Sequence, residues 1–99
     1  MINYSSAARL DIIAIYRYGA TQFGPSQALS YTSALNEMIG LLAHQPKLAP
    51  LRHEFQTPVR IHPWRQHYII YHTDDTDLMI VRILHRASDV TQHLMGDTD

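Results

Sequence analysis

The segment LMIVRILHRASD, residues Leu78–Asp89, decides the fold class of this chain. It begins as an apolar run that is interrupted only by Arg82, and the pair His85 and Arg86 closes it. An arginine inside a strand is unfavourable unless its side chain is paired or its face is open to solvent or to a partner. We therefore expect a strand with one face in the core and an opposite face on which Arg82 points outward. The expected core face consists of Met79, Val81 and Ile83.

Three shorter strands are expected elsewhere in the chain. Ile2–Tyr4 suggests a brief first strand, and in Val59–Ile61 two apolar residues flank Arg60. The residues of His67–Thr73 alternate in the manner of a strand. Thr73–Thr76 has the composition of a hairpin turn that leads into the last strand, Leu78–His85.

Between the first two expected strands the apolar spacing is helical. One helix should begin near Ser6, and a second should run from Pro25 to about His44 before Gln45-Pro46 ends it. Because the connection at Gly24 is short, the two helices should pack as an antiparallel hairpin. Their core stripes are Ala8, Ile12, Ile15 and Gly19 in the first helix, and Ala28, Tyr31, Leu35, Met38 and Leu42 in the second.

The expected order of elements is therefore β-α-α-β-β-β in a single domain, residues 1–99. This order predicts an α+β fold in which an antiparallel helical hairpin packs on one face of a mostly antiparallel sheet, with the other face partly open. Residues 90–99 should form a flexible or short helical tail.

Composition excludes several classes of protein. The chain of 99 residues has no cysteine, which rules out a disulfide framework and thiolate metal sites and fits a reducing cytosol. No apolar run is long enough to span a membrane, and residues 1–5 do not resemble a signal peptide. The net charge of −1 argues against a general nucleic-acid binder. The basic side chains gather in residues 47–72, however, and predict a patch for an acidic partner.

Short motifs along almost the whole chain, in their order and spacing, resemble the ParE toxins of the RelE/ParE superfamily, whose members are small toxins of bacterial type II toxin–antitoxin modules. The motifs are Ala8-x-x-Asp11-Ile12-x-x-Ile15-x-x-Tyr18, Phe23-Gly24, Gln27-Ala28-x-x-Tyr31-x-x-x-Leu35, Leu42-Ala43-x-x-Pro46, Arg52, Val59-Arg60, His67–Tyr71 and Ile80-Val81-Arg82-Ile83-Leu84-His85-x-x-x-Asp89.

The resemblance implies a cytoplasmic protein without enzymatic activity and without a cofactor. It implies that the protein binds DNA gyrase and blocks it, and that a cognate ParD-like antitoxin holds it inactive. It implies no membrane partner and no direct sequence-specific binding of nucleic acid. Two alternatives stay open: a RelE-like ribosome-dependent mRNA endonuclease, and an inert remnant that only binds its antitoxin.

An endonuclease on this fold needs groups that move the 2′-OH proton and neutralise the phosphorane. Arg82, His85 and Arg86 would supply them. A stacking aromatic is also useful for RNA, yet no aromatic residue follows Tyr71. The gyrase interpretation instead expects target contacts from Arg60, Trp64, Arg65, Arg82, His85 and Arg86.

Several of these residues also have purely structural interpretations. Arg82 could pair with Asp11, with Glu37 or with a backbone carbonyl instead of meeting a target. His85 and Arg86 could end the strand before a turn that Asp89 caps. Trp64 could fold back over the edge of the core instead of serving as an interface anchor.

Two further groups of residues bear on binding. Leu10, Ile13 and Tyr16 on the first helix, with Leu41 on the second, lie off the core stripes and are expected to bind the antitoxin. His62, His67 and His72 recur every five residues, but that spacing sends His67 and His72 to opposite faces of a strand, so no metal site is expected.

Overall fold

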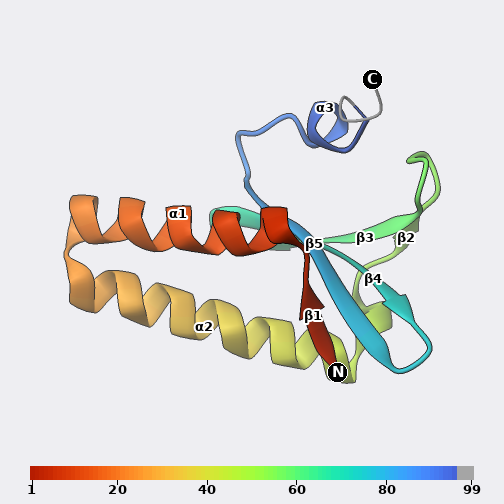
Figure 1. The fold of residues 1–99 in the computed structure, drawn as a ribbon, viewed down its shortest axis with the longest axis horizontal. Helices are drawn as coiled ribbons and strands as arrows, with labels where there is room; N and C mark the ends of the chain where they lie inside the picture. Colours follow the sequence, from red (N-terminus) through yellow and green to blue (C-terminus); the bar gives the residue numbers. More distant parts are fainter. Residues whose placement is uncertain (96–99) are drawn as a thin grey trace.

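The computed structural model describes residues 1–95 and has the expected order of elements (Figure 1). It adds a turn of 3-10 helix and a two-residue strand between α2 and β3. The tail expected over residues 90–99 begins with a short helix, and residues 96–99 lie outside the described range. The elements are β1 Ile2–Tyr4, α1 Ser6–Phe23, α2 Pro25–His44, η1 Pro46–Leu48, β2 Leu51–Arg52, β3 Val59–Trp64, β4 His67–Asp74, β5 Asp77–His85 and α3 Val90–Met95.

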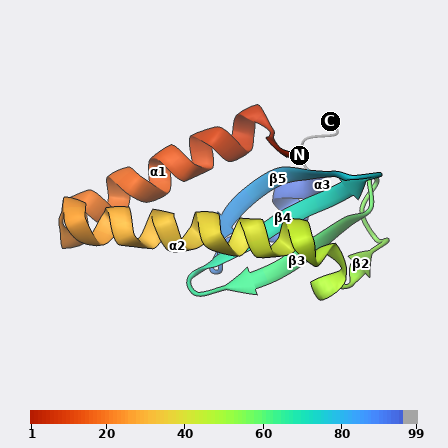
Figure 2. The ribbon, with the colours of Figure 1, turned by 90° about the horizontal axis from the view of Figure 1, so that it is seen from below.

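The five strands form one sheet in the order β1-β5-β4-β3-β2. β1 runs parallel to β5, and the other neighbours are antiparallel. Helices α1 and α2 pack on one face as an antiparallel hairpin, and the turn between them projects past the ends of the strands (Figure 2). The expected fold class is confirmed. In the described part of the chain, no helix is both long and apolar enough to cross a bilayer.

Local signals in the sequence fix the ends of the helical hairpin. The Ser5 side chain accepts a hydrogen bond from the Ala8 amide at 2.9 Å and so caps the start of α1. Gly24 ends α1 and precedes α2 with a φ of 97°, a backbone region that side chains with a Cβ rarely adopt. Pro25 occupies the first turn of α2, where its missing N–H costs nothing.

The sheet has an apolar cluster on each face. Leu35, Ile39 and Leu42 of α2 pack with Tyr71 and other strand residues under the hairpin. On the opposite face a smaller cluster consists of Phe55, Val59, Ile70 and Leu84, and Val90 and Leu94 of α3 pack against it.

Of the expected core residues of the last strand, Ile83 is confirmed but Met79 and Val81 are wrong, because β5 contains a bulge. Ile70 of β4 lies opposite Arg82, but Tyr71 lies opposite Ile80, so Val81 is an extra residue without a partner. Strict alternation from Ile80 would have put Arg82 among the apolar side chains under the hairpin; the bulge brings in Ile83 instead. The inward residues of β5 are therefore Leu78, Ile80 and Ile83, while Val81 and Leu84 contact the other cluster.

The prediction that Arg82 points outward is also wrong, and its pairing with Asp11 is confirmed. Nε and Nη2 of Arg82 donate to the two carboxylate oxygens of Asp11 at 2.8 and 3.0 Å. The Ile83 amide donates to the same carboxylate at 2.9 Å. Both charged side chains are largely covered, with 21% of Arg82 and 14% of Asp11 exposed. Asp11 thus connects α1 to the edge of β5 beyond the three residues that pair with β1.

Two glycine substitutions should separate backbone strain from helix propensity. A Cβ at Gly24 or Gly40 would meet no atom within 4 Å, so neither change introduces a clash. Gly24→Ala must hold a positive φ and should lower the free energy of unfolding by about 1–3 kcal/mol. Gly40→Ala, inside α2, should raise it by about 0.5–1 kcal/mol. Urea unfolding followed by circular dichroism measures both, and equal effects would contradict the assigned backbone conformation of Gly24.

Candidate functional site

One end of the sheet brings together residues that are distant in the sequence. β3 ends at Trp64, β4 begins at His67 and β5 ends at His85. In the strand register Trp64 lies opposite His67, and His67 lies opposite His85. The aromatic and imidazole rings of three strands therefore line up side by side at this end.

Arg65, in the turn between β3 and β4, is held by two aromatic rings. Its guanidinium carbon lies 4.7 Å from the centre of the Trp64 ring and 5.8 Å from that of Tyr31 on α2. The two rings meet edge to face with centres 5.0 Å apart. Trp64 also packs against the apolar cluster under the hairpin, so the interpretation that it folds back over the core is confirmed. Arg65 itself stays exposed.

Arg86 follows β5 and lies against the same turn. Its backbone amide donates to the Gln66 carbonyl at 2.9 Å, and Nη1 donates to the Arg65 carbonyl at 3.1 Å. Its guanidinium carbon lies 5.5 Å from the centre of the Tyr68 ring. Arg86 is exposed, like Arg65. The two arginines are thus fixed to one another through the backbone and supported by separate aromatic rings.

No carboxylate neutralises either of these two guanidinium groups in residues 1–95. The ion pairs of that range join the N-terminus to Asp77, Arg52 to Glu54 and Arg82 to Asp11. We name Trp64, Arg65, Tyr68, His85 and Arg86 the basic–aromatic cluster. It presents two guanidinium groups, each of which lies over an aromatic ring. Their planar N–H edges suit carboxylate or phosphate oxygens.

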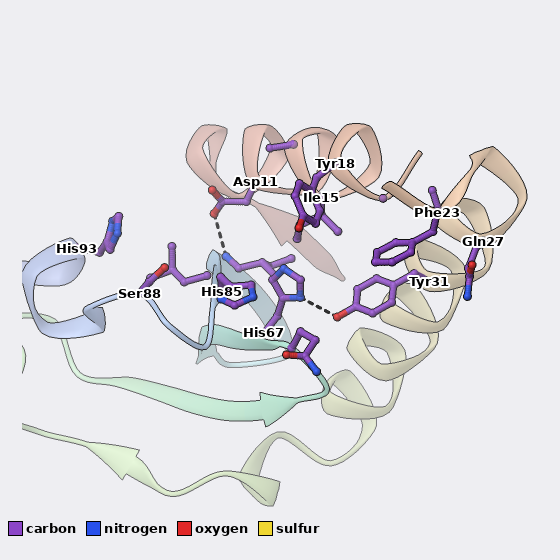
Figure 3. A pocket seen from close by; sticks show the side chains of 16 residues that line it. Asp11, Ile15, Tyr18, Phe23, Gln27, Tyr31, His67, His85, Ser88 and His93 are labelled. Atoms are coloured by element: carbon purple, nitrogen blue, oxygen red, sulfur yellow. Dashed lines mark hydrogen bonds between the residues drawn. The ribbon is translucent and has the colours of Figure 1, made fainter. Parts of the chain in front are cut away.

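His67 connects this cluster to the helical hairpin. Its Nδ1 lies 2.7 Å from the Tyr31 hydroxyl, and its ring meets that of His85 at 5.6 Å (Figure 3). Burial lowers the pKa of His67; the nearby His85 lowers it further, and Asp11 opposes this. Burial also raises the pKa of Tyr31, against a backbone hydrogen bond from Gln66 and the charge of Arg65. The pair is therefore a neutral imidazole and a protonated phenol at neutral pH.

The turn after β5 is the capped strand end that the sequence suggested. Nδ1 of His85 accepts a hydrogen bond from the Ala87 amide at 3.0 Å. Oδ1 of Asp89 accepts one from the Gln92 amide at 3.2 Å and caps the start of α3. These bonds fix the direction in which His85 and Arg86 leave the strand.

A cavity of about 790 Å³ lies between the projecting hairpin and this end of the sheet. Ile15 and Tyr18 of α1 and Tyr31 of α2 face His67 and His85 across it (Figure 3). The residues that line it are Asp11, Ala14, Ile15, Tyr18, Gly19, Phe23, Gln27, Ala28, Tyr31, Gln66, His67, Ile83, Leu84, His85, Ser88 and His93.

Of the six residues expected to contact a target, the structure gathers Trp64, Arg65, His85 and Arg86. Arg60 lies near the opposite end of β3, where its Nη1 donates to the Ala49 carbonyl at 2.6 Å. Arg82 is engaged by Asp11. Neither belongs to the basic–aromatic cluster.

The side chains expected to bind an antitoxin are all open to solvent. Leu10 is 67% exposed, Ile13 45%, Tyr16 37% and Leu41 42%. Leu10, Ile13 and Tyr16 follow one another at intervals of three along α1, which places them on one side of the helix. We name these three residues the α1 apolar row.

The described residues contain no group of three or more histidine or acidic side chains that could hold a metal ion. His62 lies in β3, whereas His67 and His72 lie in β4. The only histidine of these three that takes part in the site is His67, through Tyr31 and His85.

Tyr31, His67 and Tyr68 belong to the site although the sequence did not single them out for it. The helical spacing predicts a core position for Tyr31, and the sequence suggests no role for His67 except as a metal ligand. Their role depends on the pairing of β3, β4 and β5 and on the position of α2. The turn between Trp64 and His67 was the one available signal, because a two-residue turn places its flanking residues opposite one another.

The lowered pKa of His67 predicts a pH-dependent stability. As the pH is lowered below 6.5, the unfolded chain takes up a proton at this histidine more readily than the folded protein does. The free energy of unfolding should therefore decrease as the pH decreases. Above pH 6.5 the contribution is complete and constant. The slope should be less than about 1.4 kcal/mol per pH unit, because the ring is partly solvated.

Urea unfolding between pH 5 and pH 7 measures this slope. His67→Asn should reduce it, since the asparagine oxygen can still accept from Tyr31 but does not titrate. His53→Asn, at an exposed histidine away from the site, is the matched control and should keep the wild-type slope. An unchanged slope in His67→Asn would contradict the assignment.

Residues 2–90 match the model of a protein family described as the ParE toxin of the type II toxin–antitoxin system, parDE. Among solved structures, a chain from the chromosomal ParDE TA system from P. aeruginosa is similar, with a TM-score of 0.62 and 22% identity. The similarity covers 85% of this chain and 92% of that chain, and at this identity it speaks for the fold alone. No curated protein sequence matches. Because the family model spans nearly the whole sequence, the chain belongs to the ParE toxin family of type II toxin–antitoxin systems.

Proposed function

We propose that this toxin inhibits DNA gyrase by direct binding in the cytoplasm and that a cognate ParD-like antitoxin keeps it inactive until it is released. The α1 apolar row and Leu41 form the antitoxin surface. The basic–aromatic cluster forms the gyrase surface. Inhibition then requires complementary surfaces and no bond-breaking chemistry by the toxin itself.

The observation that carries the antitoxin half is the exposure of the α1 apolar row. The row consists of three large, exposed apolar side chains on one side of a helix. A partner that covers them stabilises the complex by about 25 cal/mol for each Å² of apolar surface removed from water. An amphipathic partner helix laid along α1 would cover all three and could reach Leu41 on the neighbouring helix of the hairpin. The row therefore supports a protein partner at the hairpin.

The gyrase half rests on the basic–aromatic cluster. Tryptophan, tyrosine and arginine dominate the binding energy of protein interfaces, and this cluster combines all three. Because Arg65 and Arg86 are held by rings and by backbone hydrogen bonds, they lose little conformational entropy on binding. Their charges have no carboxylate partner in the described part of the toxin, so an acidic surface of the target can supply one.

The geometry favours binding over cleavage of mRNA. The endonuclease alternative needs Arg82, His85 and Arg86 around one phosphate, but Nε and Nη2 of Arg82 donate to Asp11. Nδ1 of His85 already accepts a hydrogen bond from the Ala87 amide, so this nitrogen is not available to take the 2′-OH proton. Gyrase inhibition without catalysis is consequently the better-supported function.

Substitutions should separate the two surfaces. Arg65→Ala and Arg86→Ala should each weaken growth inhibition and the inhibition of gyrase supercoiling by about 10-fold or more, which corresponds to the loss of an interface anchor. Both should keep the circular dichroism spectrum and antitoxin binding of the wild type. Lys47→Ala, an exposed cation outside the cluster, is the control and should change neither activity. Arg82 is unsuitable for this test because its removal leaves Asp11 without its partner.

The converse variants are Leu10→Asp and Ile13→Asp. They should weaken antitoxin binding, measured by titration calorimetry, while supercoiling inhibition by the free toxin is retained. If purified toxin leaves supercoiling intact and instead cuts ribosome-bound mRNA, the endonuclease alternative replaces gyrase inhibition. If it does neither and still binds the antitoxin tightly, the protein is an inert remnant.

A further inference from the structure

The cavity between the hairpin and the sheet end has a volume and an apolar wall that neither proposed interface uses. Its volume of about 790 Å³ lies within the range of small-ligand sites, and apolar side chains form most of its wall. Ile15 and Phe23 contribute from α1, Ala28 from α2 and Leu84 from β5. The cavity is therefore large enough for a small organic molecule, and these side chains can contact its apolar part.

Two ring N–H groups lie at the sheet end of the cavity. The Tyr31 hydroxyl is hydrogen-bonded to Nδ1 of His67, and the Ala87 amide donates to Nδ1 of His85. Nδ1 of His67 is the one acceptor within hydrogen-bond distance of the phenol in residues 1–95, so we assign the phenol proton to this bond. In both rings Nδ1 is therefore engaged as an acceptor and Nε2 is left as the donor, and within residues 1–95 no acceptor is bonded to either Nε2.

The same end of the cavity has a positive electrostatic balance. Asp11 is the one carboxylate in its described wall, and its oxygens already accept three hydrogen bonds from Arg82 and Ile83. The Arg65 guanidinium lies over the ring of Tyr31, which lines the cavity, and so brings one positive charge to this end. An anion placed beside the two imidazoles would meet donors and positive charge.

We propose that this cavity binds a small organic carboxylate with an apolar body, such as a medium-chain fatty acid or an arylalkanoic acid. The carboxylate accepts hydrogen bonds from Nε2 of His67 and His85. The apolar body lies between α1 and α2 against Ile15, Phe23 and Ala28. The site is separate from the antitoxin surface proposed above and has His85 in common with the proposed gyrase surface.

The strand edge beside the cavity favours a small molecule over a peptide. A peptide strand would need free backbone donors on the edge of β5, but the Ile83 amide there is already bonded to Asp11. After β5 the chain turns away, with the amides of Arg86 and Ser88 bonded to Gln66 and His85. Polar groups at one end and apolar walls elsewhere match the head and body of one amphipathic molecule.

Decanoate is the probe, and decanol is its neutral counterpart of equal chain length. Below the concentration at which decanoate forms micelles, titration of ¹⁵N-labelled full-length protein should shift the backbone resonances of His67, His85 and Ala28 saturably. Decanoate should also raise Tm, since it binds only the folded state. Decanol should bind roughly 10-fold or more weakly, because it cannot make the charge-assisted hydrogen bonds.

Three variants test the location. Ala14→Trp, at an exposed alanine that lines the cavity, should fill it and abolish the decanoate shifts, whereas Ala43→Trp, an exposed alanine on α2 outside the cavity, should leave them unchanged. His85→Phe keeps a ring but removes the donor, and should weaken decanoate binding by about 10-fold or more while decanol binding stays the same. Circular dichroism confirms that each variant is folded.

Several results would overturn the proposal. These are equal affinity for decanoate and decanol, decanoate binding that survives Ala14→Trp, and no saturable shift with either decanoate or 4-phenylbutyrate. Self-association of the free protein that shifts the cavity resonances would make a second copy the occupant. Shifts caused only by the antitoxin would make a partner segment the occupant. None of these results changes supercoiling inhibition or antitoxin affinity, so they leave the proposed function standing.

Discussion

The carboxylate of Asp11 joins the two layers of this protein. Its oxygens accept two hydrogen bonds from the Arg82 guanidinium and one from the Ile83 amide, so that α1 is held on the last strand of the sheet by three donors. A carboxylate with 14% of its side chain exposed is tolerated because all of these donors come from the same short segment. The removal of Asp11 would take away the acceptor of two guanidinium N–H groups of Arg82 and of the Ile83 amide.

This constraint determines where the remaining charges lie. The bulge at Val81 takes Arg82 out of the apolar phase of β5 and allows it to reach Asp11, while Ile83 enters the core. The cations left for a partner at the sheet end are then Arg65 and Arg86, which no carboxylate of residues 1–95 pairs. Because α1 is anchored at Asp11 and its C-terminal half projects past the strands, a cavity remains between the hairpin and the sheet end (Figure 2).

The sequence predicted the fold well because the fold follows from local patterns. Helical periodicity, Gly24-Pro25 and Gln45-Pro46 give the hairpin and its limits, and the alternation in residues 67–73 gives β4. It also supplied Asp11 as one of three candidate partners for Arg82. The bulge could not be predicted, since an extra residue in one strand leaves no mark in an apolar run. That single residue reversed the expected faces of residues 78–81 and left Ile83 on its expected side.

The site was predicted less completely than the fold. Trp64, Arg65, His85 and Arg86 were expected to contact a target and do lie together, because they flank strand ends that the antiparallel order brings side by side. Arg60 was expected among them but lies at the other end of its strand, a distinction that requires the true length of β3. Tyr31 and His67 could not be assigned to the site from their own neighbours, because their contact joins residues that are 36 positions apart.

Amide hydrogen exchange at Ile83 tests the role of Asp11 most directly. This amide lies on the edge of β5 beyond the β1 pairing, so only its bond to Asp11 protects it. We expect Ile83 to exchange as slowly as the paired amides of β4 and β5, and Asp11→Ala to make it fast while those amides keep their order of protection. Rapid exchange at Ile83 in the wild-type protein, or slow exchange that persists in Asp11→Ala, would contradict this role.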